Sequence, residues 1–372
     1  MNCRVIFSLL SISLMFFVFS CRKQIPEPLS KTFGSGLTVI NDSFNGTDIV
    51  VVGNEGIQLL VAFERKLEDG TVLEMTKTSF LSIPAMCEDQ EGNNWDIYGV
   101  CVLGPRLGEK LPLVHSSQGF YFAFNSIYNG VEIYMEGDVD PPAPVIIGDE
   151  WLIDEEFVFA IGGFDGIPAV EEAHFELFRS KDFLVDPFHV ADSDRITVVK
   201  MGDEVRGYPH NILTRHEIVN DVMDGVPICI NFCPLTGTGY VWERGSNTYG
   251  VSGMLYNNNL VLYDRDSESL WSQVLGKSVW GEQQSEEPVQ IRTFETTFET
   301  FRNIYDFQAN VMTLETGFTF SYDGNPYDEY ISVDNFLLFP TTYQDDRLLN
   351  KARVIGVEID GECKVYPYSA FN

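Results

Sequence analysis

The chain has 372 residues, with 24 Lys and Arg against 55 Asp and Glu, and a formal net charge of −31. This charge argues against a nucleic-acid-binding protein, because contacts to phosphates require clustered basic residues. The hydrophobic fraction of 44%, which includes 28 Phe, 16 Tyr and 5 Trp, is too high for a disordered acidic chain. The length fits two domains or one large duplicated unit.

The first 20 residues have the features of an export signal peptide. Arg4 is the only charged residue there, and Val5 to Phe19 form an apolar run shorter than the roughly 20 residues needed to cross a bilayer. Ser20 and Cys21 complete a sequence similar to a bacterial lipobox, so Cys21 is the expected lipidation site. We therefore expect a lipoprotein of the bacterial cell envelope. It would contact the membrane only through this anchor and face the periplasm or the cell exterior.

Export also leads to expectations about charge and disulfides. Cleavage before Cys21 removes one basic residue and no acid, so the mature chain carries 23 − 55 = −32. Such a surface is repelled by anionic headgroups. Because an oxidising compartment permits disulfides, Cys87 and Cys101 are the best candidate pair, with two free buried thiols as the alternative. Cys229 and Cys233 lie about 13 Å apart if their strand is straight, too far to bond to each other.

Short β-branched and aromatic runs between Gly, Asn and Asp turns predict a mostly β protein of the α+β class with few short helices. In chain order, the expected strands are 49–52, 59–63, 120–124, 196–200, 226–232, 260–263 and 354–359. Helices are expected only at 170–177, 211–219 and 296–305. In the last of these, aromatic residues recur at spacings of three and four.

Two internal similarities indicate a duplication. The pattern G-x-x-V-x-G occurs at 99–104 and at 276–281, each time after a tryptophan in a polar turn, Trp95 or Trp271. The same motifs in the same order in two parts of the chain predict two copies of one β-rich unit. We place the copies at 45–136 and 225–312.

A second similarity joins Val198–Pro209 with Val354–Pro367, two expected hairpins that each end in Tyr-Pro. After the second hairpin the chain reaches Asn372 almost where a helix is expected. This segment is therefore expected to start a further repeat, either as a small terminal cap or as part of a longer chain.

These features divide the chain into six parts. They are a signal peptide at 1–20, a tether and first strand at 21–44, a degenerate first repeat at 45–136, a connecting segment at 137–192, a second repeat with the reactive side chains at 193–312, and the C-terminal segment at 313–372. Any chemistry is expected in the second repeat.

The densest run of reactive side chains lies between Tyr208 and Gln273. Its motifs, in order, are Tyr208-Pro209, His216 to Asp221, Cys233 to Leu235, Ser252-Gly253, Tyr263-Asp264 and Ser269 to Gln273. This order resembles the bacterial family called domain of unknown function 3179. The resemblance is strong over about 183–312 and weaker over 92–135. It implies kinship with uncharacterised exported proteins and no established activity.

One position departs from the family pattern. Many relatives carry a second cysteine after Cys-Pro-Leu, where this chain has Thr236. A dithiol cycle requires both thiols, so a thioredoxin-like role is not expected.

Three interpretations of His216 and Cys233 remain open. In the first, they bind a soft metal ion such as copper or zinc, with Met254 or Glu217 as additional ligands, because thiolate and imidazole suit such metals. In the second, Cys233 is the nucleophile of an enzyme and His216 its base, with Asn220 or Asp264 as the orienting group. In the third, both residues are structural parts of a scaffold or interaction protein.

Binding of a small ligand or metal near His216 and Cys233 is our first interpretation, and the cysteine-dependent enzyme is the alternative. The partner is then a small molecule or a protein of unknown identity. Five further side chains are expected to contact a ligand: Tyr208, Asn220, Ser252, Asp264 and Gln273.

Overall fold

The structure is a computed structural model that describes residues 36–78, 85–128, 130–135, 150–177, 190–305 and 309–372. The expected signal peptide at 1–20 and the expected lipidation site at Cys21 lie outside these ranges. No helix within the ranges is both long and apolar enough to cross a membrane.

Strands are the main regular secondary structure of the described residues, as expected, and the helices are few and short. The first part of the chain contains β1 (Thr38–Phe44), β2 (Thr47–Asn54), β3 (Leu59–Glu64), β4 (Met75–Lys77), β5 (Ala85–Asp89), β6 (Asn94–Asp96), β7 (Cys101–Leu103), β8 (His115–Phe120), α1 (Tyr121–Asn125) and β9 (Glu132–Ile133).

The middle part follows with η2 (Glu155–Phe157), β10 (Val158–Ala160), β11 (Phe175–Leu177), β12 (Arg195–Met201), β13 (Glu204–Pro209), α2 (His210–His216), β14 (Ile218–Met223), β15 (Val226–Cys233), β16 (Thr238–Glu243), β17 (Tyr249–Tyr256), β18 (Asn259–Asp264), β19 (Leu270–Ser272), β20 (Lys277–Trp280), β21 (Val289–Gln290), β22 (Thr293–Thr297), α3 (Phe298–Ile304) and β23 (Asn310–Met312). The last part contains α4 (Asp328–Ser332), β24 (Arg353–Ile359), β25 (Glu362–Pro367) and η3 (Tyr368–Phe371).

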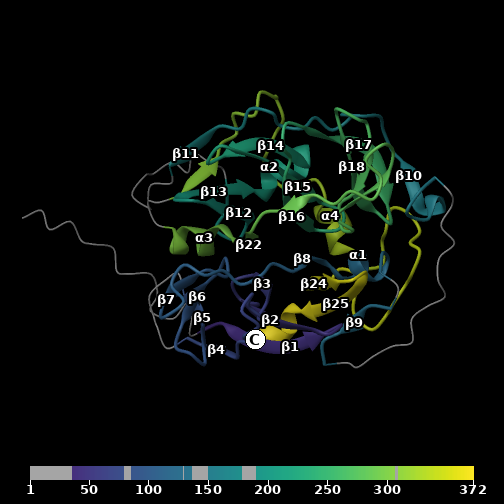
Figure 1. Ribbon diagram of the computed structural model, residues 1–372. Coiled ribbons are helices and arrows are strands. Elements are labelled where there is room, and N and C mark those ends of the chain that lie inside the picture. The colour runs from purple at the N-terminus through teal and green to yellow at the C-terminus, as the bar shows by residue number, and fades with distance from the viewer. Residues whose placement is uncertain (1–35, 79–84, 129, 136–149, 178–189, 306–308) are drawn as a thin grey trace, which may run out of the picture.

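The C-terminal hairpin is paired with strands from the beginning of the chain. Strand β24 runs antiparallel to β8, and β25 runs parallel to β9. Figure 1 shows this yellow hairpin among the purple and blue strands, below the teal and green strands of the middle part. We call β1 to β9 with β24 and β25 the N-terminal half, and β10 to β23 the central half.

The central half contains the same pattern of pairing. Its hairpin β12–β13 places β12 antiparallel to β22 and β13 parallel to β23. The other sheets of the described residues have the orders β1-β2-β3 and β4-β5-β6-β7 in the N-terminal half, and β14-β15-β16-β21 and β10-β17-β18-β19-β20 in the central half.

The tyrosine near the end of each hairpin makes a corresponding hydrogen bond to an aspartate. The Tyr208 hydroxyl at the end of β13 donates to Asp221 Oδ2 at 2.7 Å. The Tyr366 hydroxyl at the end of β25 donates to Asp42 Oδ2 at 2.8 Å. In both halves, therefore, the tyrosine of the Tyr-Pro motif bonds its hairpin to the first strand of a neighbouring sheet, β14 in the central half and β1 in the N-terminal half.

Most sequence-based elements are confirmed, with two exceptions. The helix expected at 170–177 is wrong, because Phe175 to Leu177 form β11 against β23 and Val170 bridges to Val219. The strand expected at 120–124 is instead α1, whose five residues are all buried. A short run that is apolar on every side contains no periodicity to separate helix from strand. The helix expected at 211–219 is also shorter than predicted, because α2 ends at His216 and Ile218 begins β14.

The Cys87–Cys101 disulfide is also contradicted, because both thiols are free and buried. Cys87 lies in β5 and Cys101 in β7, with β6 between them. Two strand spacings of about 4.8 Å separate the backbones by more than the roughly 7 Å that a disulfide spans. The Cys87 thiol contacts Met75 Sδ at 4.0 Å, and the Cys101 thiol donates to the Leu103 carbonyl at 3.4 Å.

Strand β15 divides two parts of the core. Ile228, Ile230 and Phe232 face one apolar cluster, whereas Cys229 and Cys233 face another. This alternation follows the two-residue period of a strand. It places Cys233 on the opposite side of β15 from Phe232.

Candidate functional site

His216 ends α2, and its imidazole is occupied at both nitrogens. Nδ1 lies 2.8 Å from the Pro168 carbonyl oxygen, and Nε2 lies 2.7 Å from the Tyr322 hydroxyl. A neutral ring that donates from Nδ1 and accepts at Nε2 satisfies both contacts. Burial lowers the pKa of His216, which favours this neutral form. Neither nitrogen is therefore available as a base for Cys233.

The backbone next to Cys233 is hydrogen-bonded to the residue that follows α2, because the Phe232 amide donates to the Glu217 carbonyl at 2.7 Å. The Cys233 thiol is 1% exposed and donates to the Asn258 carbonyl at 3.7 Å. Burial, and then the nearby Glu217 carboxyl, raise the pKa of the Cys233 thiol to about 11. A cysteine nucleophile requires the opposite shift.

Glu217 follows α2 in a left-handed conformation, with φ of 58°. Its side chain is 6% exposed, and burial raises the pKa of its carboxyl to about 8. The carboxyl is thus mostly protonated at neutral pH, and it is a poor ligand for a cation in that form.

The geometry does not fit the copper or zinc interpretation. Within the described ranges, no three His, Cys, Asp or Glu side chains are grouped so that they could hold a metal ion. Metal binding would require a thiolate at Cys233 and a free nitrogen on His216. The contacts of both side chains provide neither.

The five residues expected to contact a ligand are buried and bonded to other protein groups. Tyr208 contacts Asp221, as described above. Asn220 bonds to the backbone of Tyr249 through both ends of its amide, at 2.8 and 3.0 Å. Ser252 donates to the Val261 carbonyl at 2.5 Å within a bulge of β17. These contacts give the three side chains structural roles.

Gln273 belongs to a buried amide and hydroxyl network. Its Oε1 accepts from Thr238 at 2.7 Å and from Asn259 at 2.8 Å, and its Nε2 donates to Asn231 at 3.0 Å. Thr236 joins the same network through Thr238 at 2.8 Å.

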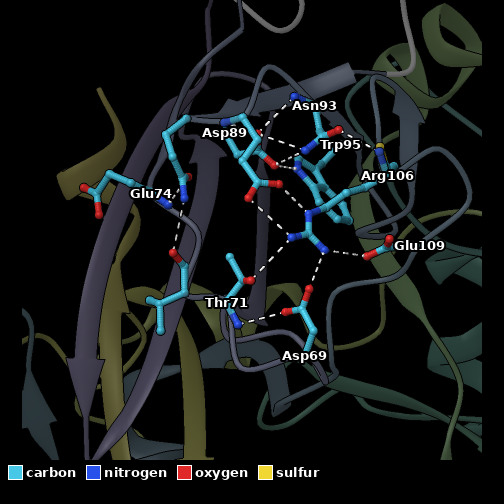
Figure 2. A network of polar contacts seen from close by, with 12 residues as sticks. Asp69, Thr71, Glu74, Asp89, Asn93, Trp95, Arg106 and Glu109 are labelled. Carbon is cyan, nitrogen blue, oxygen red and sulfur yellow. Dashed lines mark hydrogen bonds and ion pairs between the residues drawn. The ribbon is translucent and has the colours of Figure 1, made fainter.

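Asp264 is the acceptor for an indole. Trp271 Nε1 donates to Asp264 Oδ2 at 3.1 Å. The N-terminal half contains the corresponding contact, in which Trp95 Nε1 donates to Asp89 Oδ2 at 2.9 Å. Figure 2 shows the second pair beside Arg106, which is half-buried and forms ion pairs with three acidic side chains. The recurrence in both halves indicates a structural contact.

A pocket of about 530 Å³ lies where the two halves meet α4. Its walls come from distant parts of the chain. The lining residues that matter here are Phe120, Arg195, His210, Thr214, Phe232, Tyr322, Ile331, Lys351 and Arg353. Tyr322 connects this pocket to His216, whose Nε2 contacts the Tyr322 hydroxyl. The pocket is thus next to the family motifs, on the side of β15 opposite Cys233.

Two arginines on the pocket wall occupy matching positions in the two halves. Arg195 is the first residue of β12 and pairs with Thr297 in β22. Arg353 is the first residue of β24 and pairs with Phe120 in β8. Both reach one carboxylate, because Glu295 Oε2 lies 2.8 Å from Arg195 Nη2 and 3.5 Å from Arg353 Nη2.

The sequence interpretation missed these arginines. Nothing in their local sequence distinguishes them, and 158 residues separate them in the chain. The similarity between the two Tyr-Pro hairpins could have indicated them, since each arginine lies at or just before the start of one of these hairpins.

The fold and the pocket define a mostly β protein of two halves with an arginine-lined pocket between them. The chain belongs to the domain of unknown function 3179 family, because the model of that family, described as a protein of unknown function, matches residues 164–372. The matched range contains both pocket arginines. No curated protein and no solved structure shows a significant match to the chain.

Proposed function

We propose that this protein binds a small organic ligand in the pocket between its two halves. The observation that carries the proposal is the pocket of about 530 Å³ with Arg195 and Arg353 in its wall. Ligand pockets commonly have volumes of about 300–1,000 Å³ and combine apolar walls with a few polar groups. Here Phe120, Phe232 and Ile331 supply the apolar surface. This location replaces Cys233 as the expected binding centre.

The setting of this activity is the cell envelope. The apolar run at 5–19 followed by Ser20 and Cys21 supports an exported lipoprotein, attached to the membrane by its anchor alone and facing the periplasm or cell exterior. A net charge of −31 supports a folded part that remains away from anionic headgroups and does not bind nucleic acid.

The two halves are, in this proposal, two copies of one unit. The shared strand pairing of the two hairpins supports it, as do the Asp–Trp contacts in both halves. The first copy then consists of β1 to β9 completed by β24 and β25. The pocket lies at the junction of the copies, a common place for a binding site.

The proposal is tested by ligand-observed NMR with benzyl alcohol, benzoate and benzylamine as neutral, anionic and cationic probes. Wild-type protein is expected to bind at least one of them. Ile331→Trp fills the pocket and should abolish binding, whereas Val333→Trp, at a position that is 52% exposed and outside the pocket wall, should retain it. Failure of all three probes, or equal binding by Ile331→Trp, would overturn the proposal.

A further inference from the structure

The charge balance of the pocket is the starting point. Arg195 and Arg353 carry two positive charges, and Glu295, which is 4% exposed, supplies one negative charge to both. The guanidinium side chains are themselves only 18% and 19% exposed. One positive charge therefore remains uncompensated in a largely buried position, where solvent screens it poorly.

The donors of the two arginines lead to the same conclusion. Arg353 Nη1 donates to the Gly237 carbonyl at 2.9 Å. Arg195 Nη1 donates to Gln58 at 3.3 Å, and its Nη2 donates to Gln118 at 2.7 Å as well as to Glu295. Nε of each arginine is buried and has no acceptor among the described residues. A guanidinium presents its donors in a planar fork that matches two oxygens of a carboxylate.

Among the described residues, the two acidic side chains of the wall form no ion pair with Arg195 or Arg353. Lys351 Nζ is directed to the carbonyls of Val333 and Phe336 near the end of α4, at 2.6 and 2.9 Å. Asp194 accepts from the Ala191 amide at 2.9 Å. Asp328 is exposed in the first turn of α4 and has no ion pair with either arginine.

The pKa of His210 is sensitive to the positive charges on this wall. The Nε2 atom of His210 lies 3.0 Å from the Thr197 hydroxyl, and its ring lies 4.3 Å from the ring of Phe232. Burial, and then the charges of Arg195 and Arg353, lower the pKa of His210 well below its usual value. The imidazole is therefore neutral at pH 7 and does not add to the charge of the pocket.

We propose that the ligand is an organic monocarboxylate, whose carboxylate binds the remaining donors of Arg195 and Arg353 and whose apolar part lies against Phe120 and Phe232. This inference rests on the proposed function and specifies the ligand class. With one bound carboxylate, the net charge of the two arginines, Glu295 and the ligand is zero. A phosphate dianion would make this net charge negative. The apolar walls match a hydrocarbon or aromatic group.

The test compares benzoate with benzyl alcohol, which has a similar shape and no charge. In wild-type protein we expect benzoate to bind at least about tenfold more tightly, as for a charge-assisted hydrogen bond. Arg353→Gln should lower benzoate affinity about tenfold and leave benzyl alcohol affinity within about twofold. Arg353→Lys should lie between the two, because it keeps the charge but loses the fork. Arg106→Gln is the matched control, because Arg106 is as buried as Arg353 and lies outside the pocket wall, and it should match wild type.

The outcomes separate this inference from the proposed function. If benzyl alcohol binds as well as benzoate, or if Arg353→Gln weakens both equally, the carboxylate assignment is wrong and the pocket is still a binding site. Binding of inorganic phosphate without binding of benzoate also overturns the carboxylate class. If no probe binds, both proposals fail. Circular dichroism of each variant verifies that it is folded.

Discussion

Arg195 and Arg353 begin corresponding strands in the two halves, and their Nη2 atoms lie 2.8 and 3.5 Å from the same Glu295 oxygen. The convergence follows from the fold, since β24 pairs antiparallel with β8 and β12 pairs antiparallel with β22. Two hairpins with the same pattern of pairing thus bring two like charges to one place. Glu295 reduces their repulsion and leaves the pocket positively charged.

Glu295 should therefore be important for stability. Glu295→Gln keeps the shape of the side chain but leaves two buried guanidiniums without their shared counter-ion. We expect a loss of about 3 kcal/mol in the free energy of unfolding, measured with urea. Glu282→Gln, which removes an exposed acid, should change stability by less than about 0.5 kcal/mol. Equal effects of the two substitutions would show that the shared ion pair is unimportant.

The Asp–Trp contacts should contribute similarly in the two halves. Trp271→Phe and Trp95→Phe each remove an indole donor from a buried carboxylate, at Asp264 and Asp89. We expect each to lower the free energy of unfolding by about 1–3 kcal/mol in urea titrations. Trp280→Phe, at a position that is 38% exposed, is the control and should have a small effect. A large loss in only one half would contradict equivalent roles.

Glu217 should make stability depend on pH. Burial raises the pKa of its carboxyl from 4.5 to about 8. Between these values the carboxyl is protonated in the folded protein and ionised in the unfolded chain, so stability falls as pH rises, by up to about 1.4 kcal/mol per pH unit. Below pH 4.5 both states are protonated, and this loss is absent.

Glu217→Gln removes this titration while keeping the size of the side chain. Relative to wild type, the variant should gain stability progressively between pH 5 and pH 8 in urea unfolding experiments. The Cys233 thiol, with a pKa of about 11, stays protonated in that range and does not obscure the result. A stability difference that is the same at pH 5 and pH 8 would contradict the raised pKa of Glu217.

Cys233 should react slowly with thiol reagents. Its thiol is buried and remains protonated near neutral pH, so labelling by iodoacetamide should increase with pH without a plateau below about pH 10. Subtracting the labelling of Cys233→Ser isolates this position from the other cysteines. We expect His216→Ala to leave the pH profile unchanged. A plateau near pH 7 that disappears in His216→Ala would instead support the cysteine-dependent enzyme.

Much of the fold could be predicted from the sequence because its elements are locally encoded. The tryptophans at 95 and 271 and the two Tyr-Pro hairpins have recognisable sequences, and each performs a corresponding contact in its half. The pairing of β24 with β8 could not be predicted, because no local pattern specifies which distant strand a hairpin joins.

The site expected at His216 and Cys233 differs from the pocket that we propose, for a related reason. His216 and Cys233 are chemically conspicuous, but the ring and the thiol are satisfied by Tyr322, Pro168 and Asn258. Reactive residue types were visible in the sequence, whereas their hydrogen-bond partners come from remote segments. Arg195 was inconspicuous for the opposite reason, since its significance arises only beside Arg353.

The most direct test of the account is the position of a bound carboxylate. A crystal soaked with 4-bromobenzoate should give an anomalous bromine peak in the pocket near Phe120 and Phe232, with the carboxylate against Arg195 and Arg353. Arg353→Gln crystals treated identically should show a weaker peak or none. A bromine peak only elsewhere on the protein, or an equally strong pocket peak in Arg353→Gln, would contradict the account.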